Sequence, residues 1–235
     1  MPPLQSLLPT LALLALPLSA MAARPMQTDD ARIVDTKACQ LETWVRHNRN
    51  GHEFWALPAC NPTGNLEITL GGARLTRDGT TTHDGLIQGK TLFKPMETDG
   101  WGWGLAVGNQ RKGSDRQGSP LAGDVYAYLP ASFSFQEDRL LIHANLGWQR
   151  EKASGQQHGT WGLGTEVQMT PDSWLIAETF AQNEGKPYIQ LGLRHWIVPN
   201  QIQLDATWGD RINSGGNNER WVSLGLRLLS LPFLP

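Results

Sequence analysis

Residues 173–210 read SWLIAETFAQNEGKPYIQLGLRHWIVPNQIQLDATWGD, and this stretch decides the fold that the sequence predicts. Apolar and polar side chains alternate with a period of two along successive segments, which is typical of β-strands. Short runs rich in Gly, Pro and Asn separate the segments and predict tight turns. The apolar face carries Leu175, Ala177, Ile189, Leu191, Leu193, Ile197, Ile202, Leu204 and Trp208. We therefore expect antiparallel strands with one apolar and one polar face.

The same alternation recurs from Cys39 to Leu229 and predicts about twelve strands, or about ten if the first hairpin lies outside the sheet. The connections largely alternate between short turns and long polar segments, as in outer-membrane barrels. The long segments are Arg77–Gly85, Asn109–Gly123, Arg150–His158, Asn183–Lys186 and Arg211–Arg220. The predicted fold is all-β, a transmembrane antiparallel up-and-down β-barrel.

Alternation alone does not say which face meets water, because a soluble lipocalin-like barrel shows the same pattern with its apolar face inside. Charged residues make up 18% of the chain, below the usual figure of roughly 25%. The polar face is rich in glycine, which suits a crowded lumen better than a soluble exterior. Tryptophans that could form an interfacial aromatic girdle lie on the apolar face, at Trp101, Trp103, Trp148, Trp161 and Trp208. We therefore expect the apolar face to lie against lipid.

The first residues resemble a secretory signal. Residues 1–22 contain a short apolar core and end in Ala20-Met21-Ala22, a small-x-small cleavage pattern, although no Lys or Arg precedes the core. Residues 23–37 have no clear pattern and are expected to form a periplasmic lead-in, followed by a single barrel domain over residues 38–235. We expect Sec-type export to the outer membrane of a Gram-negative cell, with membrane lipid and the barrel-assembly machinery as partners.

The two cysteines lie at equal distances from a hairpin signal. Cys39 and Cys60 flank the turn Asn48-Arg49-Asn50-Gly51, so a simple hairpin brings them face to face. An exported protein with two such cysteines is expected to contain one disulfide. The alternative is two unpaired thiols.

The inferred lumen face carries a set of ionisable side chains: His143, Glu166, Glu178, Arg194, Asp205 and Arg227. Pairing of the hairpins places His143 close to Glu166, and Arg194 almost opposite Asp205. Opposite charges at such spacing attract, and a narrow lumen strengthens each pair. The set fits a network of ion pairs that fills the barrel, or a polar pathway for small solutes. A catalytic role of His143 with Glu166 is a third interpretation.

Other classes of function find little support in the sequence. The net charge of −2 gives no electrostatic case for nucleic acid. The histidines are scattered, so no metal site is expected, and no phosphate-binding glycine spacing or serine-hydrolase signature is present. We assign no catalytic residue and expect no cofactor.

Residues Glu178, Gly192–Trp196 and Gln203–Asp205 resemble the last hairpins of a broad group of proteobacterial outer-membrane barrels. Some of that group are phenol-degradation-pathway (putative transport) outer-membrane proteins. The resemblance covers residues 88–227 and implies a barrel fold and passage of small molecules, without supplying catalytic residues. Such barrels commonly end on phenylalanine, whereas here Phe233 is followed by two further residues.

Together these patterns predict a narrow channel or binding protein for small solutes in the outer membrane, or a structural barrel. An outer-membrane enzyme with a site at the rim or in the lumen is one alternative. A soluble periplasmic lipocalin-like binding barrel is another.

Overall fold

The computed structural model describes residues 26–113, 123–212 and 219–235; the expected signal at residues 1–22 lies outside them. Within these ranges the chain forms twelve β-strands, and no helix there is long and apolar enough to cross a membrane. The strands are β1 (Cys39–Asn48), β2 (Gly51–Cys60), β3 (Glu67–Arg77), β4 (Thr80–Lys94), β5 (Trp101–Arg111), β6 (Asp124–Phe135), β7 (Leu140–Arg150), β8 (Gln157–Thr170), β9 (Ser173–Gln182), β10 (Tyr188–Val198), β11 (Ile202–Arg211) and β12 (Trp221–Leu229).

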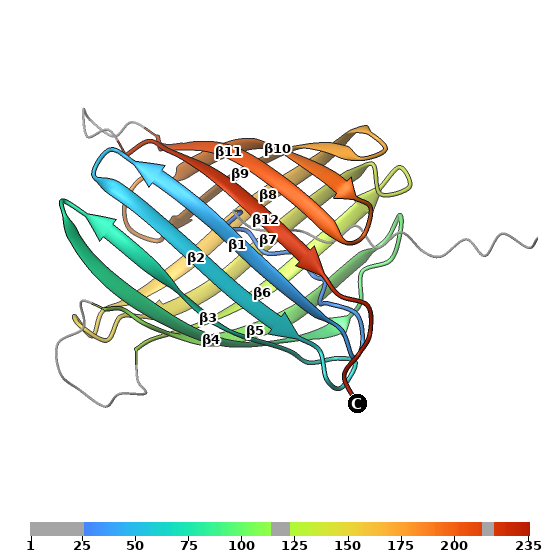
Figure 1. The fold of residues 1–235 in the computed structure, drawn as a ribbon, viewed down its shortest axis with the longest axis horizontal. Coiled ribbons are helices and arrows are strands. Elements are labelled where there is room, and N and C mark those ends of the chain that lie inside the picture. Colours follow the sequence, from blue (N-terminus) through green and yellow to red (C-terminus); the bar gives the residue numbers. More distant parts are fainter. Residues whose placement is uncertain (1–25, 114–122, 213–218) are drawn as a thin grey trace, which may run out of the picture.

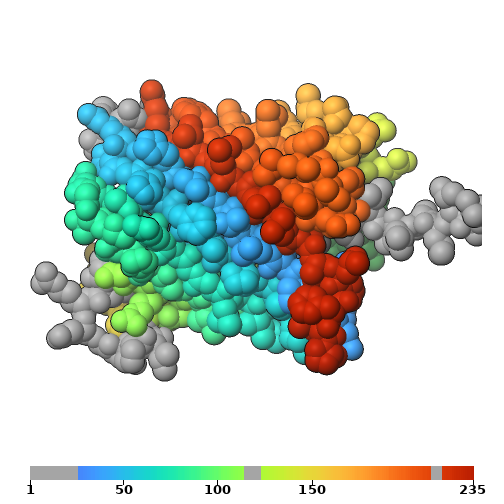
Figure 2. Space-filling model, in the orientation of Figure 1, coloured from blue at the N-terminus to red at the C-terminus, as the bar shows by residue number. Residues whose placement is uncertain are grey.

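Each strand pairs antiparallel with its neighbours in the chain, and β1 closes the sheet by pairing with β12 (Figure 1). On the face seen in Figure 2, the blue β1 lies against the red β12. The first hairpin is part of the wall, because β1 and β2 also pair with each other and β2 pairs with β3. The predicted all-β up-and-down barrel is confirmed, with the first hairpin included.

The apolar side of the pleat faces outward. Leu191 is 50% exposed and Leu224 is 69% exposed, whereas Arg194 is 1% exposed and Asp205 is also buried. A soluble lipocalin-like barrel would have the opposite arrangement, so that alternative is wrong. A large contiguous apolar exterior is stable only against another apolar phase, and a closed barrel leaves no unpaired edge strand there. The exterior therefore fits the hydrocarbon layer of a membrane.

The connection between β3 and β4 differs from the prediction. We expected a long polar loop over Arg77–Gly85, but β3 continues to Arg77 and β4 begins at Thr80. Asp78 and Gly79 form a two-residue turn with φ values of 48° and 78°. Positive φ at both positions matches a type I′ hairpin turn, for which Asp-Gly is a preferred pair. The first part of β4 was missed because residues 80–85 have no large apolar side chain on either face, which hides the period of two.

The predicted disulfide is confirmed. Cys39 and Cys60 are directly paired in the β1–β2 register and their sulfur atoms are bonded. The chain after β12 returns to the same end of the barrel, where Ser230 N–H donates to Cys39 O and Phe233 N–H donates to Lys37 O. The disulfide therefore lies at the barrel end that holds the C-terminus, which is the periplasmic end in outer-membrane barrels.

Tryptophans occupy both faces of the wall. The five expected in the girdle are exposed on the outer face: Trp101, Trp103, Trp148, Trp161 and Trp208. Others point inward and are buried, namely Trp44, Trp174, Trp196 and Trp221. The exposed set lies on the face that a girdle would occupy, and the girdle itself stays a prediction.

Candidate functional site: a polar lumen and the segment inside it

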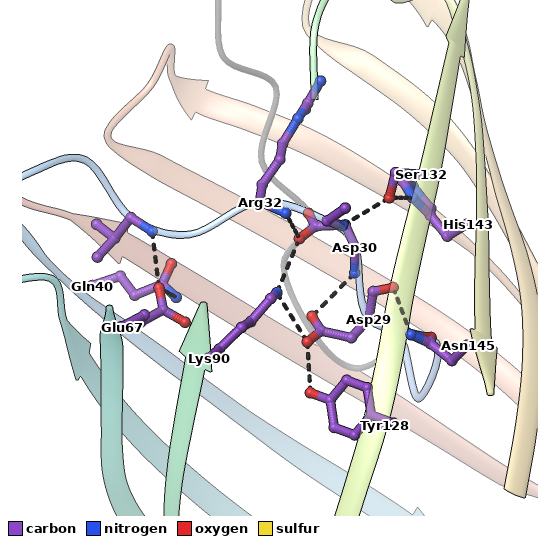
Figure 3. Close-up of polar contacts among 12 residues, drawn as sticks. Asp29, Asp30, Arg32, Gln40, Glu67, Lys90, Tyr128, Ser132, His143 and Asn145 are labelled. Atoms are coloured by element: carbon purple, nitrogen blue, oxygen red, sulfur yellow. Dashed lines mark hydrogen bonds and ion pairs between the residues drawn. The ribbon is translucent and has the colours of Figure 1, made fainter. Parts of the chain in front are cut away.

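Residues 26–36, here called the inner segment, run through the interior of the barrel (Figures 1 and 3). The side chains of Met26, Thr28, Ala31 and Val34 are buried, although the segment belongs to no strand. The sequence led us to expect a periplasmic lead-in over residues 23–37, and it gave no indication that part of this stretch lies inside the barrel. A coil inside a barrel needs partners for its backbone polar groups, and the wall supplies them.

Two buried glutamates of the wall accept backbone hydrogen bonds from the inner segment. The Glu178 carboxylate, on β9, accepts from Gln27 N–H at 2.9 Å and from Thr28 N–H at 2.8 Å. Glu67, on β3, accepts from Val34 N–H at 2.9 Å. These contacts join the segment to the wall near both of its ends.

Lys90, on β4, holds the middle of the inner segment (Figure 3). Its Nζ lies 2.9 Å from Asp29 Oδ2 and 3.4 Å from Asp30 Oδ1. Tyr128 O–H donates to Asp29 Oδ2 at 2.6 Å. Asn145 Nδ2 donates to the Asp29 carbonyl at 3.2 Å. Because Lys90 and both aspartates are largely shielded from water, loss of the cation would leave buried negative charge on the segment.

Glycines of β8 make room for the segment. A Cβ atom added at Gly162 would lie 2.6 Å from Thr28 Oγ1, and one added at Gly164 would lie 2.8 Å from Met26 Cε. Both distances are shorter than side-chain carbons tolerate, so a larger residue at either position would force the side chain of Thr28 or Met26 to move. Gly162 and Gly164, which belong to the glycine-rich lumen face, therefore lie next to the inner segment.

The structure brings four of the sequence-predicted lumen residues into one chain of contacts. His143 Nε2 lies 3.1 Å from Glu166 Oε1, and Arg194 Nη1 lies 2.8 Å from Glu166 Oε2. Arg194 also donates from Nε to Asp205 Oδ1 at 2.9 Å. The network therefore crosses from β7 to β11, with one guanidinium between two carboxylates, the arrangement that a buried pair of acids requires.

The other two predicted residues lie apart from this chain. Glu178 is held by the inner segment and by Gln190 Nε2 at 3.0 Å. Arg227 donates from Nε to Gln40 Oε1 at 2.9 Å and lies 3.8 Å from Glu42. The sequence analysis did not select Lys90 and Glu67, which bind the inner segment, although both lie on the polar face of their strands.

A hydroxyl, an imidazole and a carboxylate lie in order at one side of the network. His143 Nδ1 is 2.8 Å from Ser132 Oγ, and Ser132 Oγ accepts from Ala31 N–H at 2.8 Å. This order resembles a hydrolase triad. Ser132 is completely buried, and its oxygen is already bonded to the inner segment. An ester has no access to the hydroxyl in this arrangement, so the geometry favours a structural role for the group.

Cavities lie on both sides of the inner segment. One, of about 470 Å³, is lined by Gln27 together with residues of the β1–β2 turn and the adjacent strand ends. The other, of about 500 Å³, is lined by residues 31–36 and by turns at the disulfide end. We call them the outer vestibule and the inner vestibule. The segment thus lines both cavities, with Gln27 at one and residues 31–36 at the other. Among the described residues, no group of three or more His, Cys, Asp or Glu side chains is arranged to hold a metal ion.

Comparison with protein families places the chain in one of them. The family model described as "Uncharacterised conserved protein UCP029691" matches residues 10–229, so the chain belongs to that family. No curated protein sequence matches the chain.

The fold is similar to solved outer-membrane barrels. The KdgM porin has a TM-score of 0.63 at 8% identity, with 82% of this chain and 99% of that chain covered. The NanC porin has a TM-score of 0.60 at 10% identity, covering 82% and 100%. The COG4313 outer-membrane channel from Pseudomonas putida F1 has a TM-score of 0.58 at 9% identity, covering 87% and 100%. At such identities the likeness establishes the outer-membrane barrel fold, and the phenol-degradation group is matched only loosely.

Proposed function

We propose that this protein is a narrow outer-membrane channel for small polar solutes, and that the inner segment holds it closed. The observation that carries the proposal is the position of residues 26–36 between the two vestibules. The wall on either side carries polar and ionisable side chains, as a solute pathway requires, while the exterior is apolar. Twelve strands enclose more space than an eight-stranded barrel and less than a general porin, so the pathway is narrow.

The nature of the contacts supports a closure that can be reversed. The inner segment is held by hydrogen bonds and ion pairs to the wall, and the described part of it makes no covalent link there. Water can replace each of these partners when the segment leaves, so that neither the wall nor the segment keeps an unsatisfied group. If the segment were packed by apolar contacts alone, water could not replace the contacts that it loses on leaving.

Export through a Sec-type signal and insertion by the barrel-assembly machinery follow from the same proposal. The resemblance to phenol-degradation-pathway outer-membrane proteins and the likeness to solved porins support passage of small molecules. A role as an enzyme is less well supported, because Ser132 and His143 are enclosed.

Conductance in planar lipid bilayers tests the proposal. The exported chain and a variant that lacks residues 26–36 would be inserted under the same conditions, after heat-modifiable migration shows that both barrels are folded. We expect the intact chain to be mostly closed, and the shortened chain to give steady steps of current.

The other outcomes are informative. If both proteins give flat traces at high voltage, the barrel is not a channel and a structural or binding role replaces it. If both give the same steady current, the channel stands, but the inner segment does not close it.

A further inference from the structure

Arg46, on β1, lines the outer vestibule and is incompletely paired. Its Nε and Nη2 atoms are buried, and neither has a hydrogen-bond partner among the described residues. A buried guanidinium normally has its N–H groups satisfied, because an unpaired one loses its hydration without compensation. Arg46 therefore has unsatisfied donors beside the vestibule that it lines.

The acidic neighbours of Arg46 are engaged elsewhere. Glu53 is directly opposite Arg46 in the β1–β2 register, yet its Oε1 accepts from Arg77 at 2.9 Å and its Oε2 accepts from Trp55 Nε1 at 3.2 Å. Glu178 is bonded to the inner segment. Glu219, the other acid that lines the vestibule, is engaged by Tyr188 and Arg211. No carboxylate among the described residues therefore forms an ion pair with Arg46, although the charges of Glu53 and Glu178 act on it from further away.

Aromatic rings form the wall beside this cation. The Arg46 guanidinium lies 5.3 Å from the centre of the Trp221 ring. Phe180 and Tyr188 are stacked with centroids 5.4 Å apart, and Tyr188 lies 5.8 Å from Trp221. Such a wall offers apolar contact and ring stacking to a ligand that lies beside the cation.

Neighbouring residues of the sheet hold the Trp221 ring in position. A Cβ atom added at Gly209, its partner on β11, would lie 2.1 Å from the Trp221 ring. Trp221 Nε1 also donates to Gln190 Oε1 at 2.9 Å. A glycine beneath the ring and a buried acceptor at its edge hold the indole in place, which is what a preformed binding wall needs.

We propose that the outer vestibule binds a small organic carboxylate that carries a ring, with Arg46 on the carboxylate and the aromatic wall on the ring. The planar guanidinium matches a carboxylate with two parallel hydrogen bonds. A cavity of about 470 Å³ is large enough for such a molecule. If the site serves transport, it rests on the proposed channel and names the class of solute that passes through. Binding of the ligand by itself does not depend on the channel.

Isothermal titration calorimetry of the folded, full-length chain in detergent tests the site with three probes. Benzoate carries both features, benzyl alcohol keeps the ring without the charge, and acetate keeps the charge without the ring. We expect benzoate to bind at least about tenfold more tightly than either of the other two. Equal binding of benzyl alcohol, or equal binding of acetate, would overturn the proposal.

Variants separate the two halves of the site. Arg46→Gln should weaken benzoate binding by about tenfold or more while leaving benzyl alcohol unchanged. Gly209→Ala should displace Trp221 and weaken both ring-bearing probes. The control Arg150→Gln removes an exposed arginine that does not line the vestibule, and it should change nothing. Benzoate binding that survives Arg46→Gln would refute the assignment.

These experiments distinguish failure of the binding site from failure of the channel. Benzoate binding without conductance, even after the inner segment is removed, would retain the site and reject the channel. Conductance without benzoate binding would retain the channel and reject the site.

Discussion

Replacement of Lys90 by methionine is the substitution that we expect to weaken the binding of the inner segment to the wall most strongly. Lys90 Nζ contacts one oxygen of Asp29 and one of Asp30, and its side chain is 3% exposed. Methionine has a similar length and can occupy the same space, so the packing change is small. The variant therefore removes the cation and leaves both carboxylates inside the barrel.

The expected change in the ratio of open to closed channels can be estimated because the ion pair exists only in the closed state. Removal of one partner from a buried ion pair costs about 3–5 kcal/mol. This cost falls on the closed state alone, because water solvates both aspartates once the segment leaves. At about 1.4 kcal/mol for each factor of ten, even the lower figure raises the ratio of open to closed channels by about a hundredfold.

Single-channel recording measures this ratio directly as the fraction of time spent open. Lys94→Met is the matched control, since it removes a lysine from the same strand whose partners are Glu97 and the Trp101 carbonyl. Adding Asp29→Asn and Asp30→Asn to Lys90→Met should recover much of the closure, because the stranded charges are then gone. An unchanged open fraction in a folded Lys90→Met barrel would refute the reasoning.

The remaining predictions concern the wall. Arg194→Met should lower the free energy of unfolding by about 3–5 kcal/mol in a urea titration, because two buried carboxylates lose their shared cation; a variant that also neutralises both acids should lose less. Leu224→Arg, on the exposed face of β12, should cost about 2–4 kcal/mol in the same assay in vesicles, whereas Ser230→Arg beyond the strand should be tolerated. Cys39→Ser opens a link between residues 21 positions apart and should cost about 3 kcal/mol, with no further loss on reduction. An Arg194→Met barrel as stable as the parent would show that the ion pairs contribute little.

The wall of the barrel could be predicted from the sequence because its signal is local. A period of two needs only neighbouring residues, and the β10–β11 register that pairs Arg194 with Asp205 follows from a short turn. The disulfide is equally local, since Cys39 and Cys60 are symmetric about one hairpin. The contacts of these residues therefore followed from counting along adjacent strands.

The inner segment could not be predicted in this way. It has no periodicity, and its contacts join residues as far apart as Thr28 and Glu178. Most of its hydrogen bonds come from backbone N–H groups, which every sequence offers equally. Two indirect signals were present: the residues directly opposite Glu178, Gly164 and Gln190, carry no charge, and Gly162 and Gly164 left space on one side of the lumen.

A cross-link that holds the inner segment in place tests its closing role most directly. The Cβ position of residue 162 is 3.4 Å from Thr28 Cβ, close to the separation found in disulfides, so Thr28→Cys with Gly162→Cys should join the segment to β8. The double variant can be recorded in a bilayer before and after reductant, with each single variant as a control for reduction of the native disulfide. We predict current in the double variant only after reduction. Equal current from the oxidised and reduced forms, with the cross-link verified by mass spectrometry, would contradict closure by this segment.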